Sequence, residues 1–224
     1  RYSHLLNRGP HMEQQISYVP YDQVTEAMQA ELRRCAEHGT PRPESSAVRA
    51  HSENAFWFFA DSWKKLFHEG VVDHATKELC RVYISKTVIC EFCGNQRSEA
   101  AIGAGLQEMQ YDELLNFEKS EKYTDMQKAA LRYAQTIAWG PSSVDMDFMW
   151  AEMHKYYSEI ELVELGCCIG LTFGQQSWIR LLGIDHHQYM PGTAAAMAPG
   201  FEDKEKLQES KSQDQYWAKA ATGK

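Results

Sequence analysis

The sequence lacks long apolar runs, an excess of basic residues and a dense set of cysteines, and each absence argues against a class of protein. No apolar stretch approaches the roughly 18 residues of a membrane helix, and no signal-peptide core is visible, so we expect no membrane partner. Acidic residues outnumber lysine and arginine by 31 to 23, which argues against nucleic acid as a partner. Six cysteines are too few for a disulfide framework in 224 residues, and we expect a cytoplasmic protein.

Metal motifs and strand patterns are scarce as well. The chain has one C-x-x-C pair, Cys90 and Cys93, and neither a second such pair nor an H-x₃-H to complete a tetrahedral zinc site. We therefore expect no metal and no cofactor. No alternation of apolar and polar residues extends beyond four positions, and no repeat is evident, so the predicted fold class is all-α.

What the chain does contain is enough apolar material for one sizeable core, since 43% of its residues are hydrophobic. We expect residues 1–11, which end in Gly-Pro-His, to be the remnant of a tag. Residues 12–46 form a predicted N-terminal arm, and residues 188–224 form a predicted C-terminal tail with little apolar periodicity.

Helical periodicity and capping residues predict most of the helices. Asp73, Thr124 and Ser158 are expected N-caps, and Glu161 completes a capping box with Ser158. The expected helices span residues 22–35, 47–69, 73–89, 90–104, 111–117, 124–139, 143–157 and 158–183, and the helix that ends at 157 starts at either Ser143 or Asp145.

The C-x-x-C pair is the clearest chemical feature. Two thiols at positions i and i+3 of a helix share a face and can close into a disulfide with little backbone movement. If a helix begins at Cys90, its free N–H groups lower the thiol pKa and favour the reactive thiolate. A purely structural pair, half of a zinc site and a thioredoxin-type motif are the alternatives, and the last of these needs a preceding strand.

Glu78 lies one helix before the pair and could accept a proton from a thiol through water. A glutamate at such a position is otherwise an ordinary solvated helix residue. His186 and His187 follow the last helix and are interpreted as a surface pair.

Several sequence pieces together resemble the alkylhydroperoxidase D-like branch of the carboxymuconolactone decarboxylase family. The most specific is a glutamate, twelve residues, and then C-x-x-C, here Glu78, Cys90 and Cys93. The resemblance covers residues 47–187, and its other pieces are R-A-H-S-E-N at 49–54, F-H-E-G-V-V-D at 67–73, A-A-I-G-A-G-L at 100–106, Q-K-A-A-L-R-Y-A at 127–134, Y-S-E-I-E-L-V-E-L at 157–165 and W-I-R-L-L-G-I-D at 178–185.

The resemblance implies a helical bundle that assembles into a homotrimer or homohexamer. It also implies that Cys93 attacks a hydroperoxide, that Cys90 resolves the sulfenic acid into a disulfide, and that Glu78 relays protons. A lipoyl-bearing or thioredoxin-like partner would then reduce the disulfide.

Two positions depart from the family pattern. Arg97 stands where the family has a histidine, and Phe92 occupies a position inside the pair that is sometimes histidine. Arginine stays protonated, so it cannot relay a proton, but it can stabilise a thiolate or bind a substrate carboxylate. Both changes make the expected site more apolar.

Three functions remain open from the sequence. The first is a thiol-dependent peroxidase or disulfide oxidoreductase. The second is a cofactor-free decarboxylase, lyase or isomerase for a small carboxylate or aromatic substrate, with Arg97 as the anchor and Glu78 as the proton carrier. The third is a non-catalytic oligomeric binding module.

Overall fold

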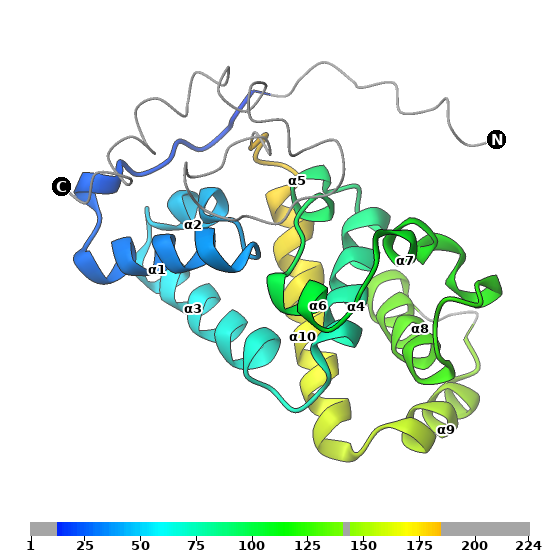
Figure 1. Ribbon diagram of the computed structural model, residues 1–224. Coiled ribbons are helices and arrows are strands. Elements are labelled where there is room, and N and C mark those ends of the chain that lie inside the picture. Colours follow the sequence, from blue (N-terminus) through cyan, green and yellow to red (C-terminus); the bar gives the residue numbers. More distant parts are fainter. Residues whose placement is uncertain (1–12, 141–143, 185–224) are drawn as a thin grey trace.

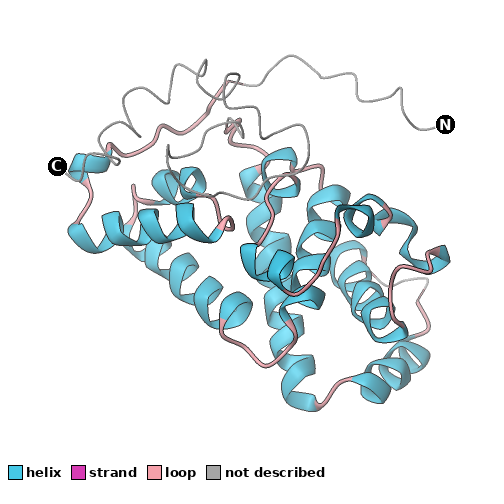
Figure 2. Cartoon of the chain, in the orientation of Figure 1, coloured by secondary structure: helices cyan, strands magenta, loops and turns pink. Residues whose placement is uncertain are grey.

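The computed structural model describes residues 13–140 and 144–184, and the regular secondary structure of these ranges is helical. Figure 2 shows their helices joined by loops, without strands. The predicted all-α class is confirmed, whereas the trimer or hexamer stays a prediction.

The helices are α1 (Glu26–His38), α2 (Pro43–Arg49), α3 (Glu53–Trp63), α4 (His74–Thr87), α5 (Glu91–Gly94), α6 (Glu99–Gly103), α7 (Glu108–Asp112), α8 (Asp125–Trp139), α9 (Met146–Tyr156) and α10 (Glu159–Ile179), with 3₁₀ turns at Tyr21–Gln23 and Leu114–Lys119 and a π-helical turn at Lys64–His68.

Helix α4 is central to the fold and packs against α8 and α10, which lie beside it in Figure 1. Every residue from Thr76 to Ser85 is buried, so these turns of α4 have no solvent face. Each fully buried aliphatic side chain on it contributes about 1.5–3 kcal/mol to stability. The charged residues on the same turns must therefore find partners inside the protein.

The predicted helix starts are confirmed where the side-chain caps are explicit. Asp73 accepts a hydrogen bond from the Thr76 N–H at 2.9 Å, and Ser158 forms the expected capping box with Glu161. Thr124 forms a second capping box, with Gln127. These contacts satisfy N–H groups that the first turn of a helix leaves without backbone partners.

The prediction of one helix over residues 47–69 is wrong. Helix α2 ends at Arg49, and Ser52 caps the separate helix α3 by accepting a hydrogen bond from the Ala55 N–H. A serine hydroxyl can replace a backbone carbonyl as the partner of an N–H group, which favours a new helix start over continuation.

The prediction of one helix from Cys90 to Ala104 is also wrong. Helices α5 and α6 are short and are separated by residues 95–98. The carbonyls of Cys93 and Gln96 accept hydrogen bonds from the Arg81 guanidinium at 2.7 and 2.8 Å. Because these carbonyls accept hydrogen bonds from a side chain of α4, they are not the acceptors of a continuing helix, and the chain turns here.

The predicted arm is helical and packs against the rest of the molecule. Val24, Met28 and Leu32 share a buried stripe, and this stripe packs in a small apolar cluster with Phe56 of α3. Helix α2 is buried throughout. Within the described ranges, no helix is long and apolar enough to cross a membrane.

The loop before α4 depends on a glycine. Glu164 of α10 accepts hydrogen bonds from the backbone N–H groups of Val71 and Val72 and from Lys77. A Cβ atom at Gly70 would lie 2.1 Å from a Glu164 carboxylate oxygen, closer than real Cβ atoms approach other atoms.

We therefore predict that Gly70→Ala displaces the Glu164 carboxylate and lowers the free energy of unfolding by about 1–3 kcal/mol. Chemical denaturation of the variant and the unchanged protein measures the difference. Gly103→Ala is the control, because a Cβ at Gly103 meets no atom within 4 Å. Equal losses in the two variants would contradict the role given to Gly70.

Candidate active site

The two cysteines of the C-x-x-C pair are joined in a disulfide, with their Cα atoms 5.4 Å apart. Cys90 is the N-cap of α5, and Cys93 lies within this four-residue helix. Both residues are buried, at 2% and 4% exposure. Ile89, just before the pair, has a φ of +57°, which is costly for a β-branched residue. The turn at Ile89 separates α4 from the short helix that carries the dithiol.

Glu78 is completely buried and faces Arg81, one turn further along α4. Its two carboxylate oxygens lie 2.5 and 2.8 Å from Nε and Nη2 of Arg81, and one of them also accepts a hydrogen bond from the Ser98 N–H at 3.0 Å. Arg81 reaches the dithiol through the Cys93 carbonyl. Glu78 is thus linked to Cys93 through Arg81.

This pair sets the charge state of the carboxylate. Burial on its own would raise the pKa of Glu78, but the Arg81 charge and hydrogen bonds, together with the Ser98 N–H, outweigh burial and lower it. Glu78 is therefore ionised at neutral pH. The relay role expected for Glu78 stays a prediction.

Sequence reasoning missed Arg81, although a signal was present. A glutamate and an arginine three positions apart on a helix are neighbours on its surface, and Glu78 and Arg81 have this spacing. On an ordinary solvated helix such a pair would be unremarkable. Its importance here comes from burial, which the local sequence does not report.

His74 and Ser98 lie at the edge of this network. His74 Nε2 is 2.6 Å from the Ser98 hydroxyl, and its Nδ1 is 3.0 Å from the Phe67 carbonyl. Burial lowers the pKa of His74, although the nearby Glu78 carboxylate opposes this shift. The described residues contain no cluster of three or more His, Cys, Asp or Glu side chains that could hold a metal ion. His186 and His187 lie outside the described residues.

Arg97 is bound by Glu108 and by backbone carbonyls at the end of α5 and in the loop after it. Its Nε donates to Glu108 at 3.0 Å, Nη2 pairs with the same carboxylate, and Nη1 donates to the carbonyls of Gly94 and Gln96. The guanidinium also lies 4.1 Å from the centre of the Tyr111 ring. These contacts secure the loop after α5. The substrate-binding or thiolate-stabilising role expected for Arg97 stays a prediction.

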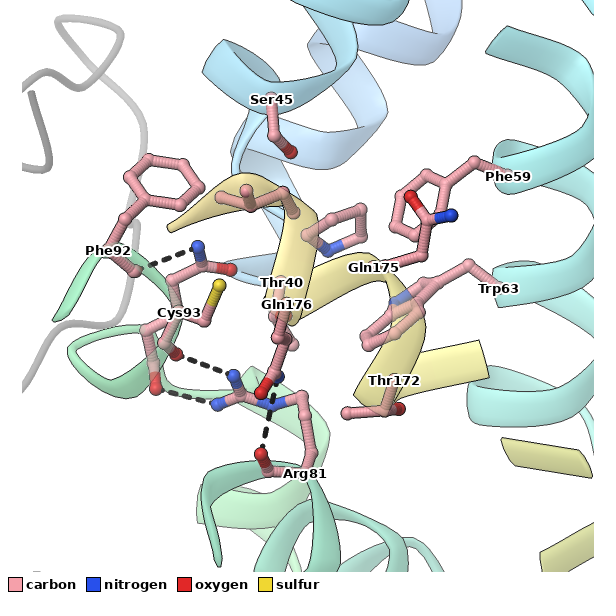
Figure 3. Close-up of a pocket in the computed structure, with 13 residues that line it drawn as sticks. Thr40, Ser45, Phe59, Trp63, Arg81, Phe92, Cys93, Thr172, Gln175 and Gln176 are labelled. Carbon is pink, nitrogen blue, oxygen red and sulfur yellow. Dashed lines mark hydrogen bonds between the residues drawn. The ribbon is translucent and has the colours of Figure 1, made fainter. Parts of the chain in front are cut away.

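A cavity of about 20 Å³ lies beside Cys93, and Figure 3 shows the residues around it. This volume exceeds the roughly 10–15 Å³ that a single water molecule needs, so the cavity has room for a small group only. Phe92, a predicted site residue, contributes to its wall, whereas Cys90 is absent from the lining. The walls come from four parts of the chain: Thr40, Pro41 and Ser45; Phe59 and Trp63; Arg81, Phe92, Cys93 and Gln96; Thr172, Gln175, Gln176 and Ile179.

One wall of the cavity is backed by a buried cation, Arg49. Its guanidinium lies 3.7 Å from the centre of the Phe59 ring and donates to Gln175 Oε1 at 2.7 Å. Burial lowers the pKa of Arg49 to about 9, so the side chain stays charged at neutral pH. Arg49 is thus a buried positive charge behind Phe59, a residue of the cavity wall.

The other cysteines differ in exposure. Cys80 and Cys168 are buried, and burial raises the pKa of both thiols. Cys167 is exposed, although it lies in an apolar helical run. It occupies the outward face of α10, while Cys168, next in sequence, faces inward.

Comparisons with known sequences give limited information about this chain. No protein-family profile matches it. Uncharacterized proteins from two strains of Mycobacterium tuberculosis are 34% identical over 94 residues, which are 42% of this chain and 33% of each of those proteins. The chain thus spans about a third of the length of the curated relatives that it matches.

Solved structures show the fold clearly. A cysteine-to-alanine variant of the debrominase Bmp8, in complex with 2,3,4-tribromopyrrole, aligns over 78% of this chain and 92% of its own at a TM-score of 0.66 and 16% identity. An alkylhydroperoxidase AhpD core protein of Ralstonia eutropha, described as peroxidase-related, aligns over 79% and 93% at a TM-score of 0.64 and 12% identity. The chain therefore has an AhpD-like fold, as the sequence resemblance implied.

The buried Glu78–Arg81 pair generates a prediction about stability. Glu78→Gln leaves the Arg81 charge buried without its carboxylate, so we expect a loss of about 3–5 kcal/mol in the free energy of unfolding at neutral pH. Folding lowers the pKa of Glu78 below its unfolded value of about 4.3. The stabilisation is therefore complete above that pH and is lost as the pH falls through the folded pKa.

Denaturation at several pH values measures this loss. The difference between Glu78→Gln and the unchanged protein should be constant above about pH 5 and shrink in more acidic solution. Glu121→Gln, at an exposed loop position, serves as the control and should show little difference at any pH. A Glu78→Gln effect that does not vary with pH would rule out this account of the ion pair.

Proposed function

We propose that this protein is a dithiol oxidoreductase that reduces small hydroperoxides. Cys93 attacks the substrate, and Cys90 closes the disulfide. One observation carries the proposal: Cys93 lines the small cavity, whereas Cys90, to which it is bonded, does not. A substrate that enters the cavity therefore meets the sulfur of Cys93 first.

The chemistry starts from the reduced dithiol. The Cys93 thiolate attacks one oxygen of the hydroperoxide, the O–O bond breaks, and the other oxygen leaves with a proton as water or an alcohol. Cys93 is then a sulfenic acid. The Cys90 sulfur attacks it, the S–S bond forms, and the hydroxyl group leaves as water with the Cys90 proton. Two thiols have then given two electrons to the peroxide, and a lipoyl-bearing or thioredoxin-like dithiol partner returns them.

In this scheme Glu78 acts on the dithiol through Arg81. The hydrogen bonds from Arg81 and Ser98 to its carboxylate, together with its lowered pKa, make Glu78 a weak proton acceptor. Its carboxylate instead holds the Arg81 guanidinium against the Cys93 carbonyl. We therefore propose Glu78 as a positioning residue for α5.

The structural likeness to a debrominase favours a second candidate, reductive debromination of a small aromatic ring. The same two thiols would supply two electrons, a C–H bond would replace the C–Br bond, and bromide would leave. A cavity of about 20 Å³ does not hold a brominated ring unless its walls move. Hydroperoxide reduction is therefore the first candidate.

The lyase alternative depends on Arg97 as an anchor for a substrate carboxylate. Glu108 already binds two of the nitrogen atoms of that guanidinium, and Arg97 does not line the cavity. A carboxylate substrate would have to displace Glu108, which makes this function the weakest of the three enzymatic candidates.

The peroxidase proposal predicts the behaviour of the thiols. Hydrogen peroxide should remove two thiols per chain from the reduced protein without linking chains together. Cys93→Ser should abolish peroxide consumption, whereas Cys90→Ser should leave a sulfenic acid, which dimedone labels when the protein is denatured in its presence. Thiol titration, non-reducing electrophoresis and mass spectrometry measure these results.

Cys167→Ser is the matched control, because it removes an exposed thiol outside the pair and should change neither the rate nor the extent of oxidation. The proposal fails if the unchanged protein and Cys93→Ser consume peroxide at the same slow rate. Release of bromide from a bromopyrrole by the reduced protein, without any reaction with peroxide, would favour the second candidate.

A further inference from the structure

Two residues that line the cavity of Cys93 each carry a buried polar atom without a protein partner. These atoms are the indole Nε1 of Trp63 and the amide Oε1 of Gln176. Each residue is 4% exposed, and both line the cavity together with Cys93. Trp63 approaches from α3 and Gln176 from α10, and in the view of Figure 3 Gln176 lies between Cys93 and Trp63.

The orientation of both groups is fixed by other contacts. Gln176 Nε2 donates to the Arg81 carbonyl at 3.2 Å, so the nitrogen of this amide is committed and the oxygen is the free atom. The Trp63 ring stacks between Phe59 and Phe67, at centroid distances of 5.4 and 4.5 Å. One N–H donor and one carbonyl acceptor are therefore held in place on residues that line the cavity of Cys93.

Leaving such groups without partners carries a cost in stability. Folded proteins satisfy nearly all buried donors and acceptors, and the exceptions call for an explanation. The cavity walls are largely apolar here, with Pro41, Phe59, Phe92 and Ile179 among them. Hydrogen bonds made in such a place are stronger than in water, so a ligand that satisfies both atoms gains from both.

We propose that Trp63 and Gln176 form a subsite for the hydroperoxyl group of the substrate, an inference that rests on the proposed peroxidase function. A hydroperoxyl group has one O–H, which can donate to Gln176 Oε1, and oxygen atoms that can accept from Trp63 Nε1. Its two oxygens are also the part of the substrate that a small cavity can take.

The same two atoms select against other ligands. A carboxylate has no proton to donate, so Gln176 Oε1 repels it. A bromopyrrole has an N–H donor for Gln176 but no oxygen to accept from Trp63. The donor–acceptor pair therefore distinguishes the hydroperoxide from the substrates of the competing functions.

The roles of the two side chains in the reaction follow from their chemistry. As the O–O bond breaks, negative charge develops on the oxygen that leaves, and an N–H donor fixed beside that oxygen stabilises the charge. Gln176 orients the hydroperoxyl group through its O–H. Neither side chain gains or loses electrons, because the dithiol supplies both.

The test compares two reactions of reduced Cys93. Trp63→Phe removes the N–H donor and retains an aromatic ring for stacking. We expect the rate constant for oxidation by hydrogen peroxide to fall about 10- to 100-fold, as for loss of one hydrogen bond to a developing charge. Alkylation of Cys93 by methyl iodide, which contains no oxygen, should keep its rate and its pH profile.

Gln176→Met provides an independent variant. Like Trp63→Phe, it should lower the rate of oxidation by peroxide relative to the rate of alkylation by methyl iodide. Trp139→Phe is the matched control, because Trp139 is 55% exposed and does not line the cavity, and it should leave both rates unchanged. Rapid-quench thiol titration measures oxidation, and mass spectrometry measures alkylation.

The outcomes separate this inference from the function on which it rests. If the unchanged reduced protein does not react with peroxide, the proposed function fails. If it reacts and Trp63→Phe reacts equally fast, the subsite is wrong and the dithiol chemistry stands. If Trp63→Phe loses both reactions equally, Trp63 supports the structure of the site and does not bind the substrate, which also overturns the inference.

Discussion

The structure depends on one buried ion pair, Glu78 with Arg81, in the middle of a helix that has no solvent face over the same turns. A charge in that position is tolerated only when partners satisfy it. The Glu78 carboxylate accepts hydrogen bonds from Nε and Nη2 of Arg81. The Cys93 carbonyl accepts a hydrogen bond from Nη1, and the Gln96 carbonyl accepts one from Nη2. The stability of the core and the position of the dithiol are thus set by the same guanidinium.

The cavity beside the dithiol is built from distant parts of the chain. Segments from the predicted arm, α3, the α5 region and α10 each contribute part of the wall, so the site exists only when all of them are packed together. Arg49 holds a positive charge behind this wall, and the small volume limits what can reach Cys93. A C-x-x-C pair on a flexible surface would have neither property.

Sequence patterns predicted well what is decided over a few residues. Asp73, Thr124 and Ser158 cap helices because a short polar side chain can bond the first free N–H groups of the turn that follows it. Periodicity failed where a side chain competed with the backbone. Ser52 began a new helix inside a continuous apolar pattern, and Arg81 captured the carbonyls that a longer helix from Cys90 would have needed. The arm was treated as separate from the site, although Thr40, Pro41 and Ser45 form part of the cavity.

By itself, the sequence determined the helical class, the main helix starts, and the spacing of Glu78, Cys90 and Cys93, because each of these follows from residues close together in the chain. Only the tertiary structure decided which sulfur faces the cavity, that Glu78 holds Arg81 inside the core, and that Arg97 binds Glu108. It also brought together Trp63 and Gln176, more than a hundred residues apart in the sequence. Their free hydrogen-bonding atoms have no local signature, because burial and the lack of a partner arise only when distant helices pack.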